Sequence, residues 1–168
     1  LGGEMGRAAD ECCIQYRLLN RGKGPAVWSL RAQADRRRYQ ERMKRALERQ
    51  ENLSVRQGEV VELRTENGAV SQAVLSTGAV YSVRAAVIAT GTYLKGRTLI
   101  GECIESSGPD GMHAANRLTD SLLKLGLPLR RFKTGTPPRV NARTVDFDAM
   151  ELQTGDDRPV PFSFTTEQ

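Results

Sequence analysis

The spacing of hydrophobic residues changes twice in the first fifty positions. Apolar residues recur at helical spacing over residues 1–13, and residues 14–19 then alternate like a short strand. A loop is expected at 20–25. Ser29 fits the N-cap of a long helix that runs to about Gln50, whose inner face would carry Leu30, Ala34, Tyr39, Met43 and Leu47.

The middle of the chain has the pattern of a β meander. Strands are expected at 53–57, 60–64, 69–75 and 80–83, with an Asn-Gly hairpin turn at 67–68 and another turn at 76–78. Residues 85–89 are then apolar on both faces, which is typical of a strand buried in a parallel sheet. The pattern predicts an α/β fold in which a meander replaces a helical crossover.

The last third is less regular. It predicts a loop from Gly96 to Gly111, a helix at 114–125 that ends at a left-handed Gly126, and a strand at 127–132. A rigid turn is expected at 133–139, and the polar tail from Asn141 is expected to be extended, since two prolines near its end bar a helix.

Positive charge is concentrated between residues 29 and 50. This stretch holds eight basic and three acidic residues, an excess that equals the formal net charge of the whole chain, +5. Such a surface is either a solvated helix face or a contact for phosphate groups. The candidate nucleic-acid contacts are Arg36, Arg37 and Arg38.

Other classes of site find little support. Cys12, Cys13 and Cys103 have neither a disulfide framework nor zinc-ligand spacing, and His113 is the only histidine. No apolar run approaches the roughly 20 residues of a membrane span. The chain opens with Leu1 and without a signal-peptide pattern, and we expect it to be an internal portion of a longer protein.

The tripeptide Thr90-Gly91-Thr92 follows the expected strand at 85–89. Ligands of open parallel sheets bind at the carboxyl ends of strands, and a glycine there allows close backbone approach. The alternative is a tight turn that requires a positive φ at Gly91. The loop at 20–25 has a G-x-G but no complete phosphate-binding fingerprint, which favours a basic surface turn.

Three strings resemble one family in their order and spacing. They are NRGKGPAVWSLRAQADRRRY at 20–39, AAVIATGTYLKG at 85–96 and RFKTGTPPRV at 131–140. They resemble the MnmG (GidA) family of tRNA uridine 5-carboxymethylaminomethyl modification enzymes, over essentially the whole chain. The resemblance implies a cytoplasmic, FAD-dependent homodimer that uses NADH and a methylenetetrahydrofolate carbon to modify C5 of the wobble uridine of tRNA, together with the GTPase MnmE.

The same resemblance implies a fold and a set of site residues. Residues 1–95 would form part of a Rossmann-like FAD-binding domain with an antiparallel meander crossover, and 96–168 the start of an inserted α+β domain. The family's catalytic cysteines and glycine fingerprint fall outside these 168 residues, so no catalytic residue is assigned and the isolated stretch is expected to be inactive. The implied cofactor contacts are Val60, Ala89, Thr90, Gly91, Thr92 and Ala115, where some members have a serine at the last position.

Two other functions remain open at this point. One is a stand-alone basic RNA-binding module, although Tyr39, the aromatic residue of the arginine-rich stretch, is expected to face inward. The other is a fragment of a different FAD-dependent oxidoreductase or of a folate-dependent tRNA methyltransferase. The strings at 31–39 and 133–139 favour the MnmG family over that relative.

Overall fold

The computed structural model describes residues 3–135 and 137–167. The chain divides into two compact units, 1–55 with 138–168 and 56–137. The predicted domain boundary between residues 95 and 96 falls inside the second unit, and it stays a prediction.

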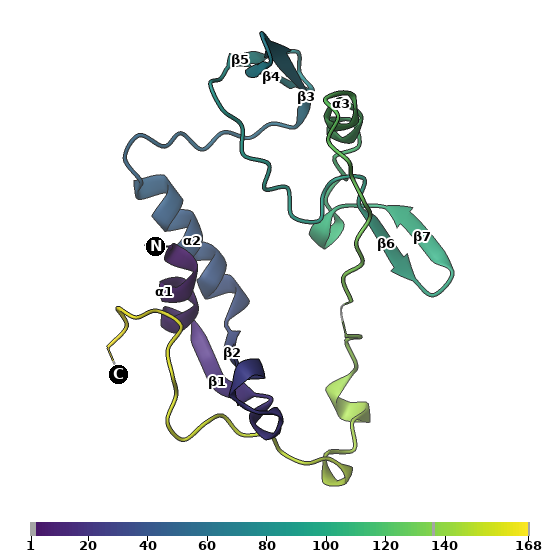
Figure 1. Cartoon of the computed structure of the whole chain (residues 1–168). Coiled ribbons are helices and arrows are strands. Elements are labelled where there is room, and N and C mark those ends of the chain that lie inside the picture. Colours follow the sequence, from purple (N-terminus) through teal and green to yellow (C-terminus); the bar gives the residue numbers. More distant parts are fainter. Residues whose placement is uncertain (1–2, 136, 168) are drawn as a thin grey trace. The chain divides into compact units, whose positions relative to one another are not determined.

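The first unit is a pair of helices joined to a two-stranded hairpin (Figure 1). Helix α1 (Glu4–Glu11) leads into β1 (Cys13–Leu19), which pairs antiparallel with β2 (Ser29–Ala34), and α2 (Arg36–Arg49) follows. Helix α1 packs against α2, with Ala8 and Cys12 buried. The predicted first helix and first strand are confirmed.

The expected start of the long helix at Ser29 is wrong. Residues 29–34 alternate between exposed and half-buried side chains, as in a strand with one covered face, and Leu30 pairs with Leu18 of β1. The helix begins at Arg36, because the Asp35 carboxylate accepts hydrogen bonds from the backbone N–H groups of Arg37 and Arg38 at 2.9 and 3.0 Å.

The C-terminal segment returns to this unit. It forms two short 3-10 turns (Ala142–Thr144 and Phe147–Ala149), which the prediction of an extended tail did not include, and no further helix or strand up to residue 167. The Asp156 N–H donates to the Tyr16 carbonyl at 2.9 Å, and the Leu18 N–H donates to the Asp156 carboxylate at 2.7 Å. The segment therefore runs beside β1 and is fixed to its backbone.

The second unit contains the predicted meander. Strands β3 (Val60–Glu66), β4 (Ala69–Leu75) and β5 (Val80–Ser82) form an antiparallel sheet, with Asn67 and Gly68 at φ 52° and 79° in the hairpin turn. Helix α3 (Leu118–Lys124) packs on β3, and its buried Ser121 hydroxyl accepts a hydrogen bond from the Leu63 N–H at 3.0 Å. The buried apolar side chains of this unit are Val61, Val74, Leu118 and Leu122.

Three predicted strands do not form. Residues 53–57, 85–89 and 127–132 pair with no strand in the described part of the chain. In the second of these, Val87 is 92% exposed. A strand that is apolar on both faces is stable only between neighbouring strands and under cover, and no described segment supplies either.

The region expected to be a loop after Gly96 contains a hairpin. Strands β6 (Arg97–Ile100) and β7 (Cys103–Ser106) pair antiparallel around Gly101, whose φ is 58°. Helix α3 begins at Leu118 rather than at Ala114, because the backbone of Ala115 is hydrogen-bonded to residues 93 and 95. Gly126 has φ 81° and ends the helix in the left-handed conformation, as predicted.

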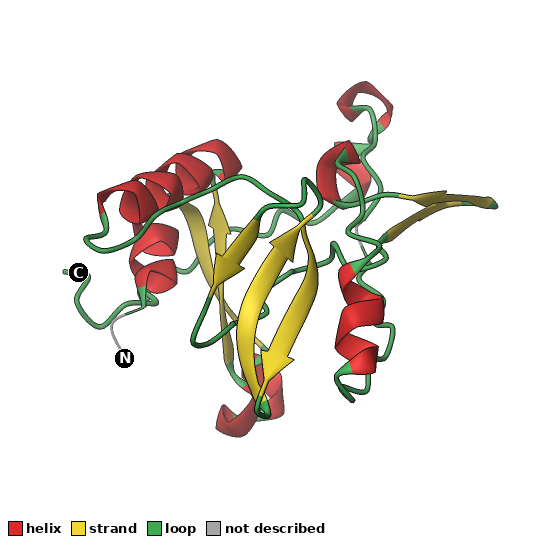
Figure 2. Ribbon diagram, turned by 90° about the horizontal axis from the view of Figure 1, so that it is seen from above, coloured by secondary structure: helices red, strands yellow, loops and turns green. Residues whose placement is uncertain are grey.

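The chain is therefore α/β, built of helices and separate small antiparallel sheets (Figure 2). The strand pairs within 3–135 and 137–167 are antiparallel, and a parallel Rossmann-like sheet is not among them. The turn expected at 133–139 is irregular at its described positions, and Thr136 lies outside the described residues. No described helix is both long and apolar enough to cross a membrane.

Candidate functional site

Residues 90–93 form a tight turn. The Tyr93 N–H donates to the Thr90 carbonyl at 3.1 Å, and Gly91 has φ 54°. A Cβ built on Gly91 would meet no atom within 4 Å. Glycine is therefore favoured here by backbone conformation, and the space beside it is open, so the turn geometry alone accounts for Gly91 within this chain.

Ala115 lies against the far end of this turn. Its N–H donates to the Tyr93 carbonyl at 2.9 Å, and its carbonyl accepts from the Lys95 N–H at 3.0 Å. The structure thus brings together four of the six predicted cofactor residues, the three of the Thr90–Thr92 turn and Ala115. Because the Ala115 N–H is already used, its methyl group and the second lone pair of its carbonyl are what it offers a ligand.

Contacts of Lys95 with Asp120 and Arg131 fix the chain just after the turn at 90–93. The sequence pattern does not predict these contacts. Lys95 has φ 43°, and its ammonium group contacts the Asp120 carboxylate at 2.8 Å. Arg131 donates a hydrogen bond from Nη1 to the Lys95 carbonyl at 2.9 Å. The hydrogen bond from Lys95 lowers the pKa of Asp120 below its ordinary value of 3.8. Nothing in the local sequence links Lys95, Asp120 and Arg131, which are brought together by the position of α3 and of the chain that follows it.

Gly96 is required by packing rather than by its own φ. A Cβ on Gly96 would lie 2.5 Å from the Ser107 carbonyl oxygen and 2.8 Å from that of Thr92. Val60, by contrast, belongs to the sheet, where it opens β3 and pairs with Leu75. Its assignment as a cofactor contact rests on the resemblance alone.

The three candidate nucleic-acid contacts occupy the first turn of α2. Arg36, Arg37 and Arg38 are exposed there, and no acidic residue shares that turn. The Asp35 carboxylate already occupies the electropositive N-terminal end of the helix, so the positive potential here comes from the three guanidinium groups, which outnumber that one negative charge. Arg38 also donates from Nη2 to the Glu11 carbonyl at 3.2 Å. The arrangement suits an anion at the beginning of α2.

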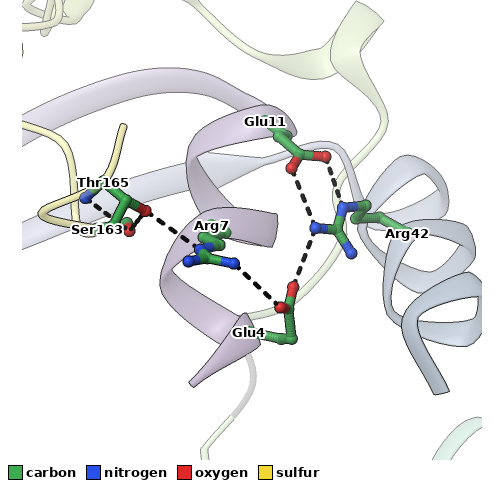
Figure 3. Close-up of polar contacts among 6 residues, drawn as sticks. All are labelled: Glu4, Arg7, Glu11, Arg42, Ser163 and Thr165. Carbon is green, nitrogen blue, oxygen red and sulfur yellow. Dashed lines mark hydrogen bonds and ion pairs between the residues drawn. The ribbon is translucent and has the colours of Figure 1, made fainter. Parts of the chain in front are cut away.

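Arg42, one turn further along, faces α1 instead (Figure 3). Its guanidinium contacts both carboxylate oxygens of Glu11, at 2.6 and 3.1 Å, and the Glu4 carboxylate at 3.0 Å. These hydrogen bonds raise the pKa of Arg42 and hold that of Glu11 below its ordinary value of 4.5. The charge of Arg42 is therefore compensated by α1, and it does not belong to the candidate nucleic-acid surface.

Lys44 and Arg45 are partly compensated within α2. The Lys44 ammonium nitrogen lies 3.6 Å from the Glu48 carboxylate, and the Arg45 guanidinium lies 3.5 Å from the Glu41 carboxylate. Both pairs have helical i,i+4 spacing and are well exposed. Part of the positive charge that the sequence places on this helix is thus neutralised locally. By sequence alone, the first turn has the highest density of basic residues in the helix, three consecutive arginines.

The structure contains no metal centre in the residues that it describes, where no three His, Cys, Asp or Glu side chains gather. Cys12 is buried, Cys13 is half-buried and Cys103 is exposed, and all three are free thiols.

A family model described as "Glucose inhibited division protein A" (GIDA) matches residues 1–168, the whole chain. The chain belongs to the GidA family. The resemblance carried by the strings at 20–39, 85–96 and 131–140 is confirmed.

Curated and solved GidA relatives agree with this assignment. The chain is 58% identical over 167 residues to the tRNA uridine 5-carboxymethylaminomethyl modification enzyme MnmG of Caldicellulosiruptor saccharolyticus, and 51% identical to that of Geobacillus thermodenitrificans. These alignments cover 99% of the chain but 27% and 26% of the relatives, so the chain spans about a quarter of their length. The crystal structure of Aquifex aeolicus GidA superposes with a TM-score of 0.89 at 47% identity, over 99% of this chain and 28% of that one.

Proposed function

We propose that this chain is part of a FAD-dependent enzyme that modifies the wobble uridine of tRNA. The reaction would add a carboxymethylaminomethyl group at C5 of the uridine, with NADH, a methylenetetrahydrofolate carbon and the GTPase MnmE, in a cytoplasmic homodimer. The observation that carries this proposal is the 58% identity over 99% of the chain to a relative named for that modification.

The part of the chain that would face flavin is the Ala89–Thr92 turn with Ala115. The space beside Gly91 is open, and Ala89, Gly91 and Thr92 are exposed, which fits close approach of a planar or phosphate-bearing group. Flavin would supply the redox chemistry when bound. The residues of this chain would only shape and position its site, since none of them is assigned a catalytic role.

The tRNA would contact the first turn of α2 through Arg36, Arg37 and Arg38. The three exposed arginines, which outnumber the single capping carboxylate of Asp35, support this assignment, because phosphate groups are the anions that such a surface attracts. Val60 remains a proposed flavin contact on the resemblance alone. The division into a partial FAD-binding domain at 1–95 and an inserted domain from residue 96 is likewise proposed.

The full-length protein that contains this chain tests the proposal directly. We expect the purified protein to show a flavin absorbance spectrum and to restore the modified wobble uridine in tRNA from a strain that lacks its own enzyme, as measured by mass spectrometry of digested tRNA. A colourless protein that leaves the uridine unmodified would exclude it. A colourless protein that binds tRNA would instead support the RNA-binding module.

A further inference from the structure

The connection between β1 and β2 is an ordered structure, here called the hairpin tip (residues 20–28). It consists of two 3-10 turns, Arg21–Lys23 and Pro25–Val27, at the end of the hairpin (Figure 1). Asn20 and Gly24 have φ 63° and 92°, and the Asn20 side-chain amide donates to the Val27 carbonyl at 3.2 Å. This bond ties the start of the tip to its end.

The hairpin tip presents a fixed aromatic ring. The indole N–H of Trp28 donates to the Arg21 carbonyl at 3.3 Å, while 49% of the residue remains exposed. The adjacent Val27 is 47% exposed. A tryptophan whose polar edge is satisfied and whose ring is half exposed offers a stacking surface at little cost in side-chain entropy.

The hairpin tip is also basic. The sequence from Arg17 to Ala34 contains four basic residues, Arg17, Arg21, Lys23 and Arg31, and no acidic residue. Arg21 contacts Asp156 at 3.0 Å, but its side chain is 61% exposed, and Lys23 is exposed as well. An exposed aromatic ring beside exposed cations is the combination that binds single-stranded nucleic acid.

We propose that the hairpin tip contacts an unpaired nucleotide of RNA, which stacks on Trp28 while Arg21 and Lys23 lie at its phosphates. The proposal rests on the proposed function, in which tRNA is the substrate, and adds a contact outside α2. Stacking requires a base that is not already stacked in a duplex, so the ligand would be a loop or an end rather than a stem. The short strand β2 leads from the tip to Asp35 and the arginines of α2, within the same compact unit.

The test uses the full-length protein and two labelled RNAs, an anticodon stem-loop and a perfect duplex of equal length. Trp28→Ala should weaken binding of the stem-loop by roughly 5- to 150-fold, the range that alanine substitution at a stacked base gives, with little effect on the duplex. Trp28→Phe should retain most of the affinity. Lys23→Gln should lower the slope of log affinity against log salt by roughly one, because the protein then neutralises one phosphate fewer.

Two matched variants control for nonspecific effects. Phe164→Ala removes a fully exposed aromatic ring of the same unit, and Lys44→Gln removes an exposed lysine of α2. Both should bind the stem-loop like the wild type. Flavin content should stay unchanged in every variant, which shows that the fold is retained.

Three other outcomes would contradict, in turn, the RNA contact of the hairpin tip, the exposure of the Trp28 ring and the proposed function. If the wild type binds the stem-loop and Trp28→Ala binds it equally well, the hairpin tip is not an RNA contact, although the proposed function stands. If Trp28→Ala instead changes the oligomeric state, the ring is covered by protein. If the wild type binds neither RNA nor tRNA, the proposed function itself fails.

Discussion

The Asp10 carboxylate accepts a hydrogen bond from the Thr166 hydroxyl at 2.6 Å, although 156 residues separate them in sequence. The same carboxylate accepts from the Tyr16 hydroxyl at 2.7 Å and from the N–H groups of Phe162 and Ser163 at 2.8 and 2.9 Å. One side chain at the end of α1 therefore holds the C-terminal segment against the first unit. Arg7 assists, since its Nε donates to the Thr165 hydroxyl at 3.1 Å (Figure 3).

We predict that Asp10→Asn releases this segment. Each Asp10 oxygen accepts two hydrogen bonds, and the amide nitrogen of asparagine cannot replace either oxygen as an acceptor. The variant should be less stable locally by about 1–2 kcal/mol, because the site is only partly buried. Limited proteolysis of the full-length protein should cut within 157–166 about tenfold faster. The control is Asp157→Asn, an exposed position beside Asp156, which should be cut at the wild-type rate.

The attachment of the segment should also depend on pH in the acid range. Partial burial opposes ionisation of Asp10, but the hydrogen bonds from Thr166, Phe162, Tyr16 and Ser163 outweigh it and lower its pKa below 3.8. A lowered folded-state pKa stabilises the folded form above pH 3.8, and this contribution disappears as the pH falls through the folded pKa. Amide exchange at residues 162 and 163, corrected for its intrinsic pH dependence, should therefore accelerate only when the pH falls below 3.8. A loss of protection above pH 5, where Asp10 stays ionised, would contradict this assignment.

Arg42 should matter more for stability than its neighbour Arg45. Arg42→Gln removes three hydrogen bonds that join α2 to α1, whereas Arg45→Gln removes one exposed pair within α2. We expect a clear fall in the thermal midpoint of the full-length protein for the first variant and almost none for the second. The thermal midpoint of Arg42→Lys should lie between those of the other two variants, because an ammonium group cannot make the bidentate contact that the Arg42 guanidinium makes with Glu11. Equal effects of the Arg42→Gln and Arg45→Gln variants would mean that the contacts of Arg42 with Glu11 and Glu4 add nothing to the stability that the packing of α1 on α2 provides.

Charge reversal at the beginning of α2 tests the proposed tRNA contact. Replacing Arg36, Arg37 and Arg38 by Glu in the full-length protein should weaken tRNA binding and flatten its salt dependence, by roughly 0.9 in slope for each phosphate that is no longer neutralised. The matched variant replaces Lys44, Arg45 and Arg49 by Glu, which changes the charge equally at the other end of the helix. If both triple variants weaken binding to the same extent, only the net charge matters and the first turn is not a specific contact.

The turn at Thr90–Thr92 can be tested by separating backbone strain from bulk. Gly91→Ala should cost about 1 kcal/mol of stability because φ is positive, and should retain most of the flavin. Gly91→Val adds bulk in the open space beside the turn and should fold but lose flavin. Thr90→Val removes only a hydroxyl and tests a hydrogen bond worth about 0.5–1.5 kcal/mol.

The readout is the ratio of flavin absorbance to protein, with far-ultraviolet circular dichroism as the control for folding. A folded Gly91→Val protein with its full complement of flavin would show that the turn does not face the cofactor. The proposed contact at Ala89–Thr92 would then be wrong.

The local sequence by itself determined the elements that depend only on neighbours in the chain. The Asn67-Gly68 turn forms because its two residues adopt positive φ readily, and the meander around it alternates as expected. Gly126 ends α3 because glycine adopts the positive φ of 81° that this helix end requires. The strings that identified the family are also local, since each is a continuous run of residues.

Helix α2 shows that two local signals can compete for the same helix start. The helical spacing predicts the helix itself, and both Ser29 and Asp35 are residue types that cap helices. The alternation of Leu30, Ala32 and Ala34 is that of a strand, which favours Asp35 as the cap. The hairpin at 97–106 shows no such alternation, because its apolar residues come in adjacent pairs, 99–100 and 103–104, on either side of Gly101. A period of 2 therefore predicts the strand at 29–34 but not this hairpin.

Only the tertiary structure decided which distant residues share a site. Asp120 lies 25 residues from Lys95, Glu4 lies 38 residues from Arg42 and Thr166 lies 156 residues from Asp10, and side-chain periodicity holds no information on such pairs. Residues 85–89 have the sequence pattern of a buried strand and yet form none in the described part of the chain. A strand forms only where neighbouring strands bind its N–H and C=O groups. Hydrogen bonding between segments is a property of the assembled chain, and it cannot be assigned from one segment alone.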